Sequence, residues 1–206
     1  MANFNFYFVS CLLLLTLSWR TSTGVPLPAP NAEKCAQCSE HFKTLLLNIK
    51  DLLNNDTFWY GARSDKVVIG STAETSLACA PTLTQTSGCM MQRNSSFSES
   101  ECLRNIMKDL AFYEAAIKSY IKSPLRSPQE EVPPLEQTLE IIGSLKKCSL
   151  KLNGESNTSE EDVTQMWGTD TFNNRQEMHK IMRGFYVRTI TINRAMGYIS
   201  SGDHRK

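Results

Sequence analysis

Three scarcities in this 206-residue sequence limit the functions it can have. Neither charge is in excess, since 22 Lys and Arg stand against 21 Asp and Glu, whereas a nucleic-acid-binding protein shows a basic excess or a basic face. No apolar run reaches the roughly 18–20 residues that span a bilayer. Histidine occurs only three times. We therefore expect neither nucleic-acid binding nor membrane insertion, and little scope for histidine chemistry.

Motifs that carry enzyme chemistry are also missing. The sequence has no GxSxG, HExxH, GxxxxGK[ST] or GxGxxG pattern. We interpret His41, His179 and His204 as solvated surface residues, because each has mostly polar neighbours or lies in the tail. The sequence thus predicts a protein that is not an enzyme and holds no metal or cofactor.

The amino terminus indicates secretion. Residues 4–19 are apolar and uncharged but too short for a comfortable membrane span, and small residues at Ser22 and Gly24 precede a suitable cleavage point. We interpret residues 1–24 as a signal peptide and residues 25–206 as one extracellular domain. Its removal takes away Arg20 and no acid, so the mature chain has balanced charges.

Six cysteines remain once the signal peptide with Cys11 is removed, an even number that predicts disulfide bonds in an oxidising compartment. They are Cys35, Cys38, Cys79, Cys89, Cys102 and Cys148. A zinc site is disfavoured, because the Cys35-x-x-Cys38 pair has no second closely spaced pair to complete it. Three N-x-[ST] sequons, at Asn55, Asn94 and Asn157, predict glycosylation.

Apolar residues recur at three- and four-residue spacing in four segments, which predicts four amphipathic helices. We expect them at about 36–54, 99–123, 134–152 and 172–200. The third is predicted to begin after Pro133-Pro134, and Pro124 is predicted to stop the second. The fold class is therefore all-α.

The lengths of the connections indicate how these helices are arranged. The first and third connections are long and the second is short. A long link lets the chain return and run parallel to the previous helix, so this pattern favours an up-up-down-down four-helix bundle of the long-chain cytokine kind, with two crossovers. The alternative is a plain up-down bundle with decorated loops.

The last predicted helix carries a specific motif. Residues 185–199, FYVRTITINRAMGYI, resemble F-x-[IV]-R-x-[VI]-T-I-[DN]-R-x-M-x-Y-[LI], the closing helix of the interleukin-12 alpha subunit family. Residues 78–83 (ACAPTL), 102–113 (CLRNIMKDLAFY) and 38–46 (CSEHFKTLL) are similar to other stretches of that family. The resemblance covers most of the mature chain and is weakest over 54–75 and 124–170.

Such a resemblance implies a secreted cytokine subunit. It would pair with a receptor-like beta subunit, engage the receptor chains of interleukin-12, and drive interferon-gamma production and type 1 responses. Pairing with a second receptor-like subunit, as in interleukin-35, is also implied. The alternatives are a helical cytokine that acts alone and a secreted helical carrier or accessory protein.

The family pattern also suggests disulfide pairings. It implies Cys79–Cys102 and Cys38–Cys89. For the remaining two we expect Cys35–Cys148, because the start of the first helix and the end of the third lie at the same pole of an up-up-down-down bundle. All six cysteines would then be used, and the heterodimer would be non-covalent; the alternative is that Cys89 forms the bond to the beta subunit. One departure is His179, which stands where the family usually has a cysteine that ties the last helix to the first connection.

The motif assigns surface roles as well. Arg194 matches the arginine that the family inserts into an acidic pocket of the beta subunit. We expect Tyr198, Thr191 and, nearer the rim, Arg188 to share its face of the helix. Phe172 aligns with an aromatic residue presented to a receptor, with Trp167 close before it, although a core position for Phe172 is an equal alternative.

Overall fold

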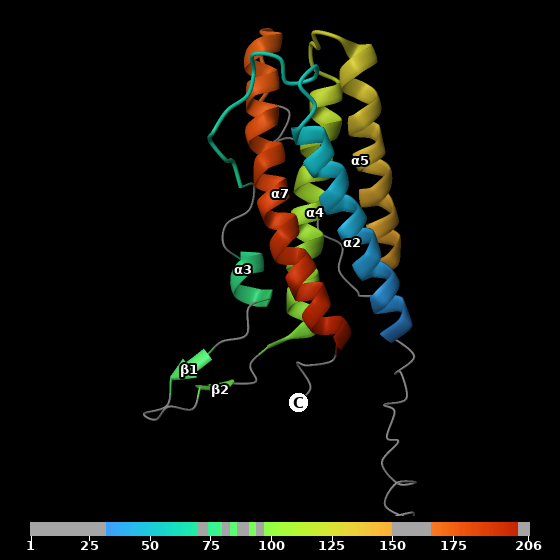
Figure 1. Ribbon diagram of the computed structural model, residues 1–206, viewed down its shortest axis with the longest axis vertical. Coiled ribbons are helices and arrows are strands. Elements are labelled where there is room, and N and C mark those ends of the chain that lie inside the picture. Colours follow the sequence, from blue (N-terminus) through green and yellow to red (C-terminus); the bar gives the residue numbers. More distant parts are fainter. Residues whose placement is uncertain are drawn as a thin grey trace, which may run out of the picture. The chain divides into compact units, whose positions relative to one another are not determined.

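The computed structural model describes residues 32–69, 74–79, 83–85, 91–93, 97–149 and 166–201. Four long helices dominate it: α2 (Ala32–Leu53), α4 (Glu99–Ile121), α5 (Pro128–Ser149) and α7 (Thr171–Ser201) (Figure 1). The chain forms two units, residues 1–33 and 34–206, and the second contains α4, α5, α7 and nearly all of α2. The predicted signal peptide lies outside the described residues.

Contacts between side chains establish the direction of each helix. Cys38, early in α2, is bonded to Cys148 at the end of α5, whereas Asn48, later in α2, accepts a 2.7 Å hydrogen bond from Thr138, earlier in α5. These two helices are therefore antiparallel. The side-chain amide of Asn193, late in α7, donates to the carbonyl of Phe42, early in α2, at 3.0 Å. The end of α7 therefore lies beside the start of α2, and these two helices are antiparallel as well.

Helix α4 is also antiparallel to α5 and α7. Phe97 at its start contacts Tyr198 of α7, and the Tyr113 ring stacks on Phe185 with centroids 4.1 Å apart. The hydroxyl of Tyr120, at the end of α4, donates to Glu131 at the beginning of α5. Because α2 and α4 both run antiparallel to α5 and α7, the bundle has the up-up-down-down order, as Figure 1 shows. The predicted fold class is confirmed.

The core fills the space between these helices with the residues of the apolar stripes. Phe42, Leu45 and Ile49 of α2 are fully buried, as are Met182 and Phe185 of α7. The β-branched residues of 187–192 stay helical because the stripe of α7 continues through them: Thr189 and Ile192 are also fully buried.

The start of α5 differs from the prediction. The helix begins at Pro128 and continues through Pro133 and Pro134, which were expected to precede it. Pro128 occupies the first position, where a missing N–H is harmless. Ser127 and Glu131 then close the first turn reciprocally: the Glu131 N–H donates to the Ser127 carbonyl at 2.9 Å, and Oε1 of Glu131 accepts from the Ser127 N–H at 2.8 Å.

The first connection contains short elements that the helical periodicity did not predict. Helix α3 (Glu74–Cys79) packs on α4 and α7, and strands β1 (Leu83–Gln85) and β2 (Met91–Arg93) form a small antiparallel pair. Residues 64–68 of the same connection lie against α7, where the N–H of Val68 donates to the Lys180 carbonyl at 3.1 Å. We call residues 64–68 the strap.

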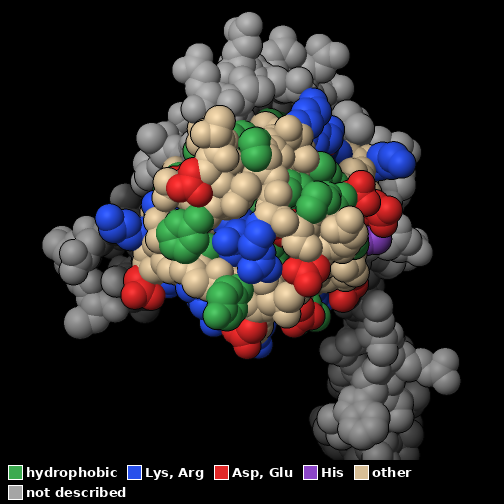
Figure 2. Space-filling model, turned by 90° about the horizontal axis from the view of Figure 1, so that it is seen from above, with side chains coloured by type: hydrophobic (Ala, Val, Ile, Leu, Met, Phe, Trp, Pro, Cys, Tyr) green, Lys and Arg blue, Asp and Glu red, His purple; other side chains and the backbone are tan. Residues whose placement is uncertain are grey.

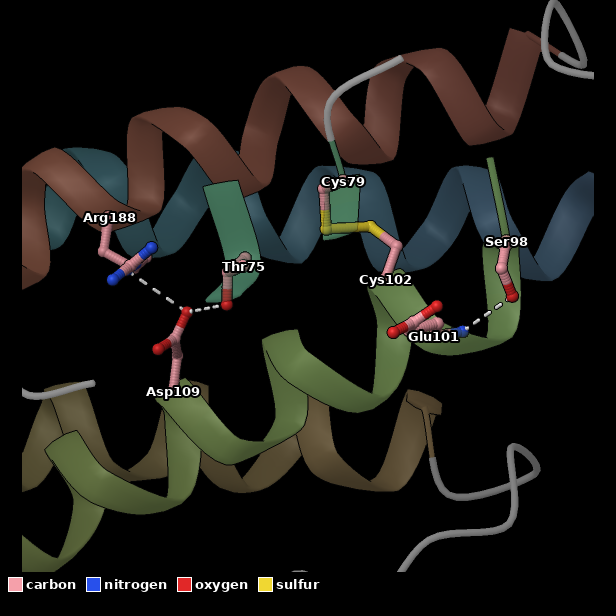
Figure 3. The surroundings of a disulfide bond; sticks show 7 residues. All are labelled: Thr75, Cys79, Ser98, Glu101, Cys102, Asp109 and Arg188. Atoms are coloured by element: carbon pink, nitrogen blue, oxygen red, sulfur yellow. Dashed lines mark hydrogen bonds and ion pairs between the residues drawn. A yellow bond between two sulfur atoms is a disulfide. The ribbon is translucent and has the colours of Figure 1, made fainter. Parts of the chain in front are cut away.

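Two disulfide bonds are described. Cys79 is bonded to Cys102, the predicted pair, which fastens α3 to the first turn of α4 (Figure 3). Cys38 is bonded to Cys148, so both the predicted Cys38–Cys89 bond and the predicted Cys35–Cys148 bond are wrong. The start of α2 and the end of α5 do lie at the same pole, as predicted, but Cys38 rather than Cys35 is bonded to Cys148. The side chains of Cys35 and Cys89 lie outside the described part.

Candidate interaction surfaces

The outer face of α7 carries three of the four residues predicted to bind the beta subunit. Arg194 is exposed, and Thr191 and Tyr198 are half-buried. Val187 continues the same face one turn earlier; its side chain is 46% exposed, and its carbonyl accepts from the Thr191 hydroxyl at 3.5 Å. The Tyr198 ring packs edge-on against Phe97, which holds it in place. Val187, Thr191, Arg194 and Tyr198 therefore form one stripe, which we call the α7 stripe.

Arg188 does not belong to this surface, contrary to the prediction. Its side chain is only 4% exposed, and its Nε lies 3.3 Å from Oδ2 of the fully buried Asp109 of α4. The hydroxyl of Thr75 in α3 donates to the same carboxylate oxygen at 2.5 Å, as Figure 3 shows. Arg188 thus joins three elements inside the fold. The signal was present in the sequence, because Arg188 and Asp109 lie three residues from the core residues Phe185 and Ile106.

An aromatic patch lies where α7 begins. Phe172 is 42% exposed, which favours the surface alternative over the core one. The guanidinium of Arg175 lies 5.9 Å from the centre of its ring and donates to the Tyr60 carbonyl at 2.9 Å. Tyr60, which the sequence analysis missed, is 74% exposed. Gly61 follows it with φ of 69°, and a Cβ there would lie 3.8 Å from the Phe172 ring.

This patch belongs to the end of the bundle where α2 and α4 finish and α5 and α7 begin. Figure 2 views that end and shows separate hydrophobic patches around basic side chains, with acidic ones near the edge. Asp170 orders the start of α7 by accepting from the Phe172 N–H at 2.8 Å. We call Tyr60, Phe172 and Arg175 the pole patch.

Trp167 is not presented to a receptor in the way predicted. Its indole N–H donates to the Ser119 hydroxyl of α4 at 2.7 Å, and its ring packs edge-on against Tyr120 at 5.1 Å between centroids. The residue is half-buried. Both interactions use the indole to close the last turn of α4 against the segment before α7, a packing role that helical periodicity does not reveal.

His179 is buried rather than solvated, which is a further error of the sequence interpretation. Its Nδ1 accepts a 3.1 Å hydrogen bond from the Ser64 N–H of the strap, and Trp59 contacts its ring edge-on. Burial, with the nearby charges of Arg183 and Arg63, lowers the pKa of His179 from 6.5 to about 4. The neutral form that this hydrogen bond requires is therefore the stable one.

The strap is held along α7 by further polar contacts. The guanidinium of Arg183 donates to the Ser64 carbonyl at 2.7 Å, next to the bond from Ser64 to His179. Gly184 allows the close approach, since a Cβ at this position would lie 1.8 Å from the Val68 carbonyl oxygen. Hydrogen bonds from Ser64 to His179 and from Arg183 to Ser64 thus tie the last helix to the first connection.

The remaining predicted residues are modification sites. Asn55 lies in the turn after α2, and Asn94 and Asn157 lie outside the described residues. Within the described ranges no three His, Cys, Asp or Glu side chains are grouped as a metal site would require. None of the described helices combines the length and hydrophobicity of a membrane span.

Comparison with known proteins identifies the family. The model of the interleukin-12 alpha subunit family matches residues 70–202, which include α4, α5 and α7. The chain is 23% identical to interleukin-12 subunit alpha of Equus caballus over 216 residues, covering 94% of this chain and 96% of the relative. It is 25% identical to that of Felis catus over 219 residues, with the same coverage of both chains. The family match and the four-helix bundle agree, and the chain belongs to the interleukin-12 alpha subunit family of cytokines.

Proposed function

We propose that this chain is the secreted four-helix subunit of a heterodimeric cytokine, and that it binds a receptor-like beta subunit through the α7 stripe. The observation that carries the proposal is the exposure of Arg194 on that stripe, within residues 185–199, which resemble the closing helix of the family. An arginine suits this role because its planar guanidinium binds a carboxylate through two hydrogen bonds and stays charged when desolvated.

The composition of the stripe supports the same role. Val187 offers apolar surface, Thr191 a hydroxyl and Tyr198 a partly packed aromatic ring around the cation. Interfaces of non-obligate complexes combine an apolar or aromatic centre with arginine in this way. Because Arg188 is buried, Arg194 is the exposed basic side chain in the C-terminal half of α7.

The pole patch supports a second contact, with a signalling receptor chain. Tyr60 and Phe172 are exposed aromatic residues, and the contacts of Arg175 with the Phe172 ring and the Tyr60 carbonyl hold the two segments together. Ordered exposed aromatics are typical hot-spot residues. The heterodimer then engages the interleukin-12 receptor chains and drives interferon-gamma production and type 1 responses. Pairing with the receptor-like subunit of interleukin-35 is the second candidate.

Co-secretion tests the pairing. The chain is expressed alone and with each candidate beta chain, and secreted heterodimer is measured by non-reducing electrophoresis. We expect poor release of the chain alone and efficient release with its beta chain. Equal release with and without every candidate would instead favour a carrier, an accessory protein or a cytokine that acts alone.

A further inference from the structure

A groove between α2 and α5 lies beside a glycosylation sequon. It has a volume of about 350 Å³, and its lining includes Leu47, Asp51, Asn55, Pro134, Gln137 and Ile141. Leu47 is 60% exposed, a large apolar side chain in the middle of a long helix. Neither the α7 stripe nor the pole patch includes any of these residues.

The turn that holds Asn55 is well ordered. The Oδ1 atom of Asn55 accepts from the Phe58 N–H at 3.0 Å, and the backbone N–H of Asn55 donates to the Leu52 carbonyl at 3.1 Å. The Trp59 indole donates to the same Leu52 carbonyl at 2.6 Å, which anchors the turn in the core. An N-linked sugar attaches to Nδ2, the other arm of the amide, and leaves the carbonyl oxygen in place. Glycosylation is thus compatible with the hydrogen bond that shapes this turn.

The chemistry of the groove suits a carbohydrate. A pyranose ring has an apolar face of C–H groups and a rim of hydroxyls. Leu47 and Ile141 supply apolar surface, while Asp51 and Gln137 supply a carboxylate and an amide for hydrogen bonds. Asn55 is half-buried in the lining of the groove, and the next two sequon residues, Asp56 and Thr57, are both exposed, so the sequon lies at the surface beside the groove.

We propose that Asn55 carries an N-linked glycan whose inner sugars cover the α2/α5 groove. The glycan shields Leu47 and withdraws this face from protein partners, which directs the beta subunit and the receptor to the α7 stripe and the pole patch. The inference rests on the secretion proposed above, because N-glycosylation takes place in the secretory pathway.

The experiment compares the secreted wild-type heterodimer with a Thr57→Ala variant, which destroys the sequon but keeps Asn55 and its hydrogen bond. Peptide mass spectrometry measures glycan occupancy at Asn55. Hydroxyl-radical footprinting then measures the oxidation rates of Leu47 and of Leu125, a half-buried leucine beyond α4 that serves as the internal reference.

We expect a glycan on Asn55 and oxidation of Leu47 at least about threefold slower in the wild type than in Thr57→Ala, with Leu125 unchanged. An unmodified Asn55, or equal oxidation of Leu47 in the two proteins, would overturn the proposal. Protection of Leu47 in Thr57→Ala that depends on the beta chain would also overturn it, because a protein would then cover the groove. Heterodimer yield is scored separately, so failure here is distinguishable from failure of the pairing.

Discussion

The guanidinium of Arg188 in α7 and the carboxylate of Asp109 in α4 form an ion pair inside the bundle, with Nε 3.3 Å from Oδ2 and side-chain exposures of 4% and 0%. Thr75 of α3 donates to the same carboxylate, so the pair also anchors the first connection. A buried ion pair is weak evidence for stability in itself, but the loss of one partner leaves an uncompensated charge in the core.

We therefore expect Arg188→Ala to lower the free energy of unfolding by about 3–5 kcal/mol and to reduce the yield of folded protein. Urea denaturation of the purified chain measures the change. The double variant Arg188→Leu with Asp109→Leu should recover most of the loss, since it removes both charges. A destabilisation below about 1 kcal/mol for Arg188→Ala, together with weaker binding to the beta chain, would contradict this structural role and indicate that Arg188 contacts the beta subunit.

The close approach of the strap to α7 leads to a second prediction. Gly184→Ala places a methyl group 1.8 Å from the Val68 carbonyl oxygen, so the strap must move away. We expect a loss of about 1–3 kcal/mol in unfolding free energy, as overpacking produces.

Gly197 of the same helix is the matched control for this substitution. A Cβ there meets nothing within 4 Å, so Gly197→Ala should stabilise the chain by up to about 1 kcal/mol through helix propensity. Thermal melts of both variants give the comparison. Equal effects of the two substitutions would show that the strap does not rest on Gly184.

His179 makes the stability depend on pH. Its pKa is about 4 in the folded chain against 6.5 for an ordinary histidine, so the unfolded chain takes up this proton first. The contribution of neutral His179 is complete above pH 6.5 and declines as pH falls towards 4. Protonation also removes the acceptor for the Ser64 N–H.

The test compares unfolding free energies of wild type and His179→Asn at several pH values between 7.5 and 4.5. Asparagine offers an uncharged acceptor near the position of Nδ1, so we expect a shallower decline with acid in the variant. Carboxylates titrate in both proteins and cancel in the difference. Parallel curves would contradict a role for His179 protonation.

The helices and their order were predictable from the sequence. The apolar stripes of α2, α4 and α7 predicted three helices well, because burial of a stripe repeats every few residues along one element. The lengths of the connections predicted the up-up-down-down order for a similar reason, since a crossover needs many residues. Arg194 was placed correctly on an exposed face because its neighbours Ala195 and Met196 continue the buried one.

The errors share a different origin. His179 is buried by the strap, and Trp167 is half-buried against the end of α4; both contacts join segments far apart in the sequence. No local periodicity encodes them. The start of α5 was misplaced because Pro133-Pro134 is a typical helix start, whereas the Ser127–Glu131 pair that closes the first turn was overlooked.

Receptor engagement at the pole patch gives a fourth prediction. Phe172→Ala and Tyr60→Ala should each raise the heterodimer concentration for half-maximal receptor signalling by at least about tenfold, because hot-spot aromatics contribute most of the binding energy. Secretion with the beta chain should stay normal, since both side chains are exposed.

Leu47→Ala provides the control for those variants, because it truncates an exposed apolar side chain on the α2/α5 face and should leave signalling unchanged. Reduced secretion of Phe172→Ala would indicate a core role for that ring. Unchanged signalling by both aromatic variants would move the receptor contact elsewhere.

The most direct test of the account is the affinity of Arg194→Ala for the purified beta chain, measured by titration beside Arg104→Ala, an exposed arginine of α4. We expect the Arg194 substitution to weaken association by at least about 2 kcal/mol, which is about thirtyfold in Kd, and the Arg104 substitution to leave it unchanged. An unchanged affinity for Arg194→Ala would contradict the α7 stripe as the site where the beta subunit binds.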